Sequence, residues 1–243
     1  MDRRNFSKLL ALLAISPNQG LGNISKKDKI IIVGAGIVGS SIAYHLTKMG
    51  AEVTVIERDR PAAHASGRNF GWLHASYPTK PYSFHHLLRL SLLTYKKLET
   101  EIGIDIHWGG SFEWHALKEN QKILTQEIEI QQGYGVPIHM ISGDQAHEFE
   151  PNVKFDKEAN MAFSESDGAV DSNEVVNKFL KKTINLGGQV LYPVTYENVK
   201  VKNRKIVSVR TSIGEIEADR VVFACGLDTD ELLNIDVLKK SEP

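Results

Sequence analysis

Cysteine is almost absent from this 243-residue sequence: Cys225 stands alone, so no internal disulfide bond can form. An excess of charge is also lacking, because 29 lysine and arginine residues balance 30 aspartate and glutamate residues. This balance gives no electrostatic basis for binding nucleic acid. The cysteine and histidines have no zinc-site spacing, and the pair His85-His86 is interpreted as part of a solvated helix surface, so no metal is predicted.

Hydrophobic runs of membrane-spanning length are missing as well. The apolar stretch at residues 9–15 is far shorter than the roughly 20 residues that cross a bilayer, so no transmembrane span is predicted. This stretch follows the pair Arg3-Arg4 and Phe6, a pattern that resembles a twin-arginine export signal. We predict a leader and linker at residues 1–28 and a periplasmic or exported location. The alternative is an ordinary N-terminal segment of a cytoplasmic protein.

A strand–turn–helix–strand pattern begins at residue 29. Residues 29–33 are a continuous apolar run, which is typical of a buried parallel strand. Residues 37–49 indicate a helix that ends at Gly50, and residues 52–56 indicate a second strand. The first strand is followed at once by the turn Gly34-Ala35-Gly36-Ile37-Val38-Gly39. This order predicts the βαβ unit of a dinucleotide-binding domain.

The residue types in this turn suit a pyrophosphate. Gly34 permits the tight turn, Gly36 lets the backbone approach the phosphates, and Gly39 lets the helix pack closely on the strand. The helix N-terminus adds unpaired N–H groups and a partial positive charge. Glu57 follows Gly34 by 23 residues (57 − 34), close to the spacing of about 20 for the acid that binds a ribose diol. Its negative charge disfavours NADP.

A second block of small and polar residues follows the second strand. It contains Ser66, Gly67, Arg68, Asn69, Phe70 and Gly71. Serine and asparagine offer short polar side chains, the glycines permit close approach, and the arginine neutralises phosphate charge. Together with the turn, this block resembles the D-amino-acid oxidase-like FAD-dependent oxidoreductases, which include glycine and sarcosine oxidases and D-amino-acid dehydrogenases. The resemblance implies a loop along the flavin pyrophosphate; the alternative is a capped surface loop.

The resemblance extends to the C-terminal part of the chain. Residues 220–226 indicate another buried parallel strand that ends in glycine. The resemblance implies that its end, Ala224-Cys225-Gly226, touches FAD and that the backbone at Val199 lies by the adenine. Arg58, next to Glu57, is assigned to the same cofactor site. Cys225 itself is interpreted as a small core residue rather than a nucleophile, because it falls in an apolar run.

The predicted fold class is α/β. We expect a Rossmann-like FAD-binding domain with a central parallel sheet, and an interleaved, incomplete α+β substrate domain. The cofactor domain takes residues 29–80 and 165–232, the substrate-domain segment residues 81–164, and the tail residues 233–243. The periodicity of apolar residues predicts helices at residues 82–102, 119–132, 143–149 and 173–186, the last of them capped by Asp171 or Ser172.

The family resemblance implies the reaction. An amine or amino acid (a D-amino acid, glycine or an N-methyl amino acid) would be oxidised by hydride transfer to flavin N5, with O2 or a quinone as electron acceptor. Some relatives bind the flavin covalently through a histidine at the place of Arg68, so noncovalent FAD is predicted here. His64 and His74 keep the covalent alternative open. No catalytic residue is assigned.

The family also continues with a C-terminal third that this sequence does not contain. We therefore predict a truncated form, in which a partner chain supplies the missing part. Two alternatives stay open, a nonenzymatic flavin-binding remnant and an NAD-dependent dehydrogenase.

Overall fold

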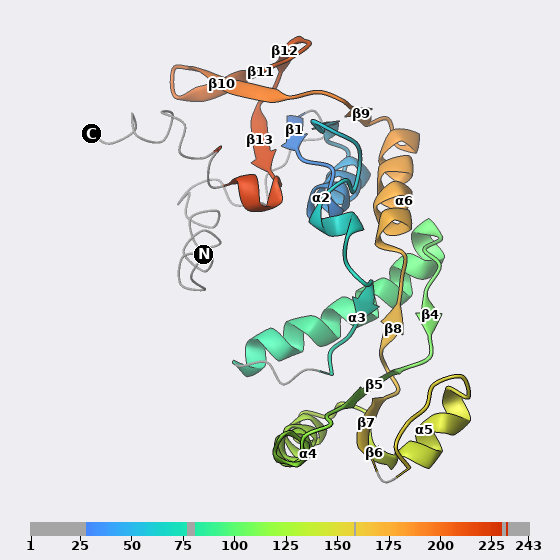
Figure 1. Ribbon diagram of the computed structural model, residues 1–243. Coiled ribbons are helices and arrows are strands. Elements are labelled where there is room, and N and C mark those ends of the chain that lie inside the picture. The colour runs from blue at the N-terminus through green and yellow to red at the C-terminus, as the bar shows by residue number, and fades with distance from the viewer. Residues whose placement is uncertain (1–27, 77–80, 158, 230–231, 233–243) are drawn as a thin grey trace. The chain divides into compact units, whose positions relative to one another are not determined.

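The computed structural model describes residues 28–76, 81–157, 159–229 and 232 (Figure 1). The chain divides into two compact units: unit 1 comprises the residues up to Ala65 and from Phe179 onward, and unit 2 comprises Ser66–Lys178. The predicted leader, up to residue 27, and the predicted tail lie outside the described residues. The predicted domain limits stay a prediction. In the described part of the chain, no helix combines the length and the apolar character needed to cross a membrane.

Unit 1 is built around a parallel sheet with the strand order β13-β1-β2-β9. Its strands are β1 (Lys29–Val33), β2 (Glu52–Ile56), β9 (Gln189–Leu191) and β13 (Arg220–Phe223). The apolar run of β1 is buried on both faces, as expected for the inner strand of a parallel sheet. The predicted α/β class with a central parallel sheet is confirmed.

An antiparallel meander covers one face of this sheet. It consists of β10 (Tyr196–Lys202), β11 (Lys205–Thr211) and β12 (Gly214–Glu217). Because successive side chains of a strand point to opposite faces, Ile31 and Val33 of β1 point the same way. They join Tyr196 and Val209 of the meander in one buried cluster. The meander is thereby fixed to the sheet by apolar contacts.

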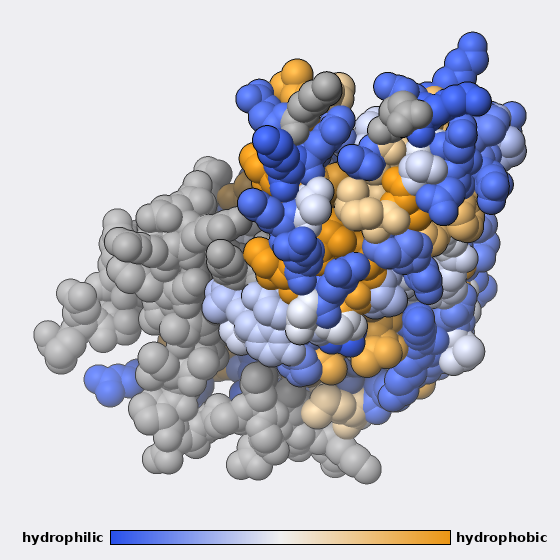
Figure 2. Space-filling view, turned by 90° about the horizontal axis from the view of Figure 1, so that it is seen from below, coloured by the Kyte–Doolittle hydropathy of each residue, from blue (hydrophilic) through white to orange (hydrophobic). Residues whose placement is uncertain are grey.

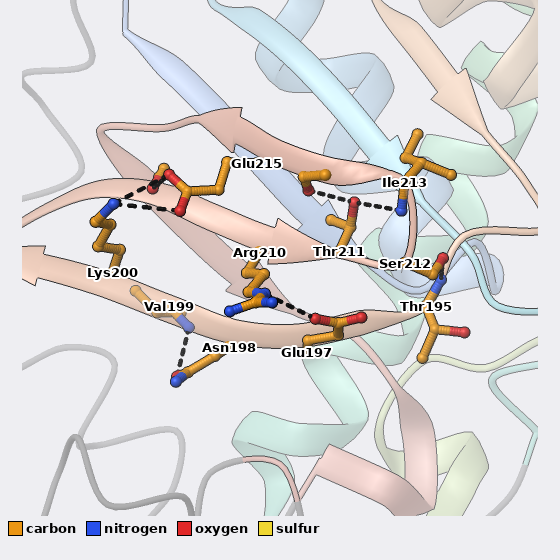
Figure 3. Close-up of polar contacts among 12 residues, drawn as sticks. Thr195, Glu197, Asn198, Val199, Lys200, Arg210, Thr211, Ser212, Ile213 and Glu215 are labelled. Atoms are coloured by element: carbon orange, nitrogen blue, oxygen red, sulfur yellow. Dashed lines mark hydrogen bonds and ion pairs between the residues drawn. The ribbon is translucent and has the colours of Figure 1, made fainter.

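A tight turn joins β10 to β11, and exposed ion pairs, which add little to stability, join strands of the meander. The turn between β10 and β11 places Asn203 and Arg204 at φ 51° and 59°, the left-handed values of a tight two-residue hairpin turn. Figure 3 shows two ion pairs of the meander: Arg210–Glu197 joins the neighbouring strands β11 and β10, and Lys200–Glu215 joins β10 to β12, on the other side of β11.

Helix α2 (Ile37–Lys48) packs against β1 and β2 (Figure 1). Its Tyr44 contacts Phe179 of α6 (Ser172–Asn185), with ring centroids 5.7 Å apart. Asp171 caps α6, because its Oδ1 accepts hydrogen bonds from the backbone N–H groups of Asn173 at 2.8 Å and Glu174 at 3.3 Å. These bonds lower the pKa of Asp171. The helix was predicted from the sequence with Asp171 or Ser172 as its cap, and the hydrogen bonds show that Asp171 caps it.

Unit 2 contains two three-stranded antiparallel sheets and the helices α3, α4 and α5. The first sheet, in the order β3-β8-β4, contains Trp72–Leu73, Gly168–Ala169 and His107–Trp108. The second sheet, in the order β5-β7-β6, contains Ser111–Trp114, Asn160–Ser164 and Ile138–Ser142. The helices are α3 (Tyr82–Ile102), α4 (Lys118–Gly133) and α5 (Gly143–Phe149), all of which the periodicity predicted.

The core of unit 2 forms where α4 packs on the second sheet. Leu124 and Ile128, one helical turn apart, are both 1% exposed and contact Ile138 and Ala162. Sequence patterns missed strands β6 and β7. Their side chains are buried on both faces of the sheet at several positions, so the alternation that reveals a half-buried strand is absent.

Gly71 occupies a position that other residues would strain. Its φ is +67°, and a Cβ there would lie 1.9 Å from the carbonyl oxygen of Val170. We expect Gly71→Ala to lower the free energy of unfolding by about 2 kcal/mol or more, because of the left-handed backbone and the clash. Urea denaturation followed by circular dichroism measures this. Gly109→Ala is the control, since a Cβ at Gly109 meets nothing within 4 Å. Equal effects of the two substitutions would contradict the prediction.

Candidate functional site

The glycine turn of unit 1 closes where three strands end. The Gly34 N–H donates to the carbonyl of Ile56 at 2.8 Å, which ties the end of β1 to the end of β2. Gly34 has a φ of +106°, and a Cβ there would lie 2.5 Å from the carbonyl oxygen of Ala224. A Cβ on Gly39 would lie 2.0 Å from the carbonyl oxygen of Gly34. Close packing of backbone against backbone therefore requires glycine at both positions.

Glu57 is the buried acid of this turn. It is 8% exposed, and its Oε2 accepts a hydrogen bond from the Ala35 N–H at 2.9 Å. Its Oε1 accepts from the Asp59 N–H, also at 2.9 Å. A carboxylate offers about four acceptor positions, so these two bonds leave room for donors such as the hydroxyl groups of a sugar. Glu57 both braces the turn and presents acceptors beside it.

The start of α2 is open to a ligand. Gly36 is the N-cap residue, no side chain caps the helix there, and the first turn contains no acidic residue. Val38, in this first turn, is 59% exposed. A helix N-terminus carries a partial positive charge and N–H donors that favour an anion. The turn thus combines an anion-binding end with an acid at its edge.

The end of β13 lies alongside the same turn. The Ala224 N–H donates to the Val33 carbonyl at 2.8 Å, and the Cys225 thiol donates to the same carbonyl at 3.2 Å. A short 3₁₀ turn, Gly226–Asp228, follows. Arg58, beyond β2, forms an ion pair with Asp228 at 2.8 Å. The structure thereby brings together, within unit 1, residues that the sequence separates by more than 160 positions.

Cys225 has the properties of a packing residue. Burial raises the pKa of its thiol to about 11, so the reactive thiolate is scarce near neutral pH. Its side chain packs at the edge of the cluster that contains Ile31 and Val33.

No group of three or more histidine, cysteine, aspartate or glutamate side chains that could hold a metal ion occurs among the described residues.

The second block forms a compact loop in unit 2. Asn69 holds it together: its Nδ2 donates to the Ser66 carbonyl at 2.7 Å, and its Oδ1 accepts from the Gly71 N–H at 2.7 Å and from the Ser172 hydroxyl at 2.8 Å. Gly67 ends the short 3₁₀ turn Ala65–Gly67 that opens the loop. Arg68, Asn69 and Phe70 of the loop are exposed. Asn69, one of the residues predicted to bind the cofactor, therefore also organises the loop.

Val199 lies on β10, where its side chain packs against the cluster beneath the parallel sheet. Its N–H donates to the Asn198 side chain at 2.7 Å, as Figure 3 shows.

Sequence reasoning missed a buried polar group in unit 2, Asp167, and the indole of Trp72. A single charged or aromatic residue carries no periodic signal, so only their surroundings in the fold distinguish them.

Comparison with known proteins identifies the family. A family model described as DAO, FAD dependent oxidoreductase, matches residues 29–241. This chain belongs to that family. Glycine oxidase from Bacillus licheniformis is 30% identical over 210 residues, which cover 83% of this chain and 55% of that protein. D-amino acid dehydrogenase from Rhizobium rhizogenes is 24% identical over an alignment covering 82% of this chain and 61% of that protein.

Solved structures of family members share the fold. L-proline dehydrogenase from P. horikoshii superposes with a TM-score of 0.75 at 26% identity, covering 86% of this chain and 55% of that chain. Glycine oxidase from Bacillus cereus gives a TM-score of 0.78 at 24% identity, covering 85% and 57%. The predicted family is confirmed, and with it the assignment to FAD-dependent enzymes. The chain spans from 22% to 61% of the length of the curated relatives described as oxidases or dehydrogenases.

The carboxylate of Glu57 is expected to stabilise unit 1. In Glu57→Gln, one acceptor oxygen becomes an NH2 donor that faces a backbone N–H. We expect the free energy of unfolding to fall by about 1–3 kcal/mol, the cost of leaving a buried donor unpaired. Urea denaturation of the cofactor-free protein measures it. Glu52→Gln, at the exposed first residue of β2, the strand that precedes Glu57, is the matched control and should change stability by under about 0.5 kcal/mol. An unchanged stability of Glu57→Gln would refute the bracing role.

Proposed function

We propose that this chain forms the FAD-binding part of an oxidoreductase that oxidises an amine or an amino acid. One observation carries the proposal: Glu57 presents unused acceptor positions beside the uncapped N-terminus of α2. That pairing of an acid and an anion-binding helix end suits the ribose and pyrophosphate of a dinucleotide. The relatives named glycine oxidase and D-amino acid dehydrogenase support the substrate class.

The residues of unit 1 would hold the adenosine half of FAD. Glu57 would accept hydrogen bonds from the ribose hydroxyls, and its charge would repel the 2′-phosphate of NADP. The backbone at Gly36 and the helix end behind it would hold the pyrophosphate. We further propose the predicted contacts of Arg58, Val199 and Ala224–Gly226 with the cofactor, with the domain limits predicted above.

The residues of unit 2 would contribute a loop to the cofactor. In Ser66–Gly71, Arg68 is exposed and free to neutralise phosphate charge. The bound flavin would supply the redox chemistry by accepting a hydride at N5 from the carbon next to the substrate nitrogen. FAD would be noncovalent, because an arginine stands where covalent relatives carry a histidine. His64 forms a hydrogen bond with Asp59, with 2.7 Å between Nε2 and Oδ2, which orients its imidazole.

A further polypeptide would complete the enzyme. Large apolar side chains on α3 are exposed at one-turn spacing: Phe84, Leu87, Leu90 and Leu93 are 46–62% exposed. Figure 2 shows apolar side chains, in orange, reaching the surface between hydrophilic ones on the face drawn. Exposed apolar patches of this kind mark interaction surfaces. A partner chain or a further segment of the protein, together with O2 or a quinone as electron acceptor, would supply the rest of the reaction.

Flavin binding and reduction test this proposal. The full-length protein, purified with added FAD, should show a flavin spectrum that survives gel filtration and disappears on denaturation and filtration, as a noncovalent cofactor does. Under anaerobic conditions, one or more of glycine, sarcosine and a panel of D-amino acids should bleach the flavin. Release of peroxide in air would then distinguish an oxidase from a dehydrogenase. Binding of NAD without FAD would overturn the flavin assignment, and bound FAD that no amine reduces would overturn the enzymatic one.

The variant Glu57→Gln and its control Glu52→Gln test the proposed cofactor site. Glu57→Gln should weaken FAD binding about tenfold or more, because a hydrogen bond to a charged group is lost, whereas Glu52→Gln should leave it unchanged. Quenching of flavin fluorescence measures both. Equal affinities of the two variants would remove Glu57 from the proposed site.

We also propose export through the twin-arginine signal, since that route carries folded proteins with bound cofactor. In a bacterial host that possesses the pathway, a tagged full-length protein should reach the periplasm. Replacing Arg3-Arg4 by two lysines should abolish this, while replacing Lys26-Lys27 by two arginines should not. Unchanged delivery of the Arg3-Arg4 variant, measured by fractionation and immunoblotting, would show that the export proposal is wrong.

A further inference from the structure

Three aromatic rings form a row on alternate residues at the start of unit 2. Trp72 and His74, at alternate positions of the segment that contains β3, share a face, and the ring of Phe70 stacks on that of Trp72. The rings of Trp72 and His74 stack with centroids 3.7 Å apart and planes inclined by 16°. Phe70 continues the row at 6.2 Å from Trp72 and is 83% exposed. The row therefore begins at an exposed ring and continues with two half-buried rings.

Two ring nitrogens in this row are buried without a partner. Trp72 Nε1 and His74 Nδ1 have no hydrogen-bond partner in the described part of the chain. Buried polar atoms of folded proteins are nearly always paired, and each exception calls for an explanation. Because the two rings stack with centroids 3.7 Å apart, the two unpaired nitrogens belong to neighbouring rings.

A buried aspartate fixes the chain directly after His74. Asp167 is 0% exposed; its Oδ1 accepts from the Ala75 N–H at 3.4 Å, and its Oδ2 accepts from the hydroxyl groups of Ser111, at 2.7 Å, and Ser76. Burial lowers the pKa of His74, and the negative charge of Asp167 opposes this effect. The imidazole is thus held in position on rigid backbone, and a second negative charge would favour its protonation.

We propose that Trp72 and His74 form a carboxylate-binding subsite, which takes the acid group of an amino-acid substrate. This inference rests on the proposed oxidation of an amino acid and names the residues that would recognise its acid end. A carboxylate has lone pairs enough to accept from both ring N–H groups at once. Charge-assisted bonds of this kind are stronger than those to a neutral acceptor.

The indole N–H of Trp72 favours a hydrogen-bond acceptor over a cation. Trp72 Nε1 is a donor only, so an ammonium group cannot satisfy it. The Asp167 carboxylate already accepts three hydrogen bonds, which neutralise part of its charge and reduce its attraction for a cation. A water molecule could accept from one ring nitrogen, and that occupant is the competing outcome of the test.

Indole NMR signals of the full-length protein test the subsite directly. The chain contains three tryptophans, so 15N-tryptophan labelling gives three indole signals, and Trp72→Phe identifies that of Trp72. Acetate should shift the Trp72 N–H signal downfield in a saturable manner, while methylammonium, its counterpart of similar size and opposite charge, should not. The signals of Trp108 and Trp114 should move much less. A Trp72 signal that acetate leaves in place, or that methylammonium shifts equally, overturns the proposal.

Substitutions of His74, which carries the second unpaired nitrogen, provide the control. His74→Leu should weaken acetate binding roughly tenfold or more, because one hydrogen bond to a charged group is lost. His74→Asn, which keeps an N–H close to the Nδ1 position, should restore most of the affinity, and Trp114→Phe, an exposed tryptophan of the same unit, should leave it unchanged. Equal losses in His74→Leu and His74→Asn would indicate a packing role and refute the subsite.

The outcomes also separate this inference from the proposed function. FAD binding with amine-dependent bleaching but no acetate shift would overturn the subsite alone. A saturable acetate shift in a protein that binds no FAD would overturn the oxidoreductase proposal and leave the carboxylate site standing.

Discussion

Unit 1 depends on the contact of the β1–α2 turn with the end of β13. The backbone of Gly34 lies so close to the Ala224 carbonyl that a single added carbon would collide with it. This contact exists only because β13, nearly 190 residues further along the chain, pairs with β1 in parallel register. Apolar burial of Ile31 and Val33 against the meander supplies the driving force, since removing apolar surface from water is the dominant favourable term in folding. The turn is thus shaped by the sheet beneath it.

The same geometry gives Glu57 two roles. Its carboxylate accepts hydrogen bonds from the Ala35 and Asp59 N–H groups, and these bonds hold its remaining acceptor positions beside the open end of α2. A buried acid is costly unless its hydrogen bonds are made, so the turn and the acid stabilise each other. A ligand that brings hydroxyl donors and an anion fits this arrangement. Family membership and the local geometry therefore agree on a dinucleotide, and the family specifies FAD.

Unit 2 follows a different principle. Its loop and first sheet are organised by polar groups: Asn69 makes three hydrogen bonds within the unit, and Asp167 joins the segment after β3 to the start of β5. Such groups stabilise a single arrangement because each unpaired donor or acceptor would be costly. Against that background the two unpaired nitrogens of Trp72 and His74 stand out, because Asn69 and Asp167 make their hydrogen bonds.

The sequence by itself determined the βαβ unit, the long helices and the family. Apolar runs, helical periodicity and the glycine spacing are local signals, and Gly34, Gly39 and Glu57 carry them directly. It did not determine the short strands of unit 2, because segments of two residues such as β3 and β8 exist only through their partners. Only the tertiary structure decided that Asn69 organises its own loop and that two ring nitrogens are left unpaired. Burial and hydrogen-bond pairing depend on residues far apart in the chain, and no local pattern records them.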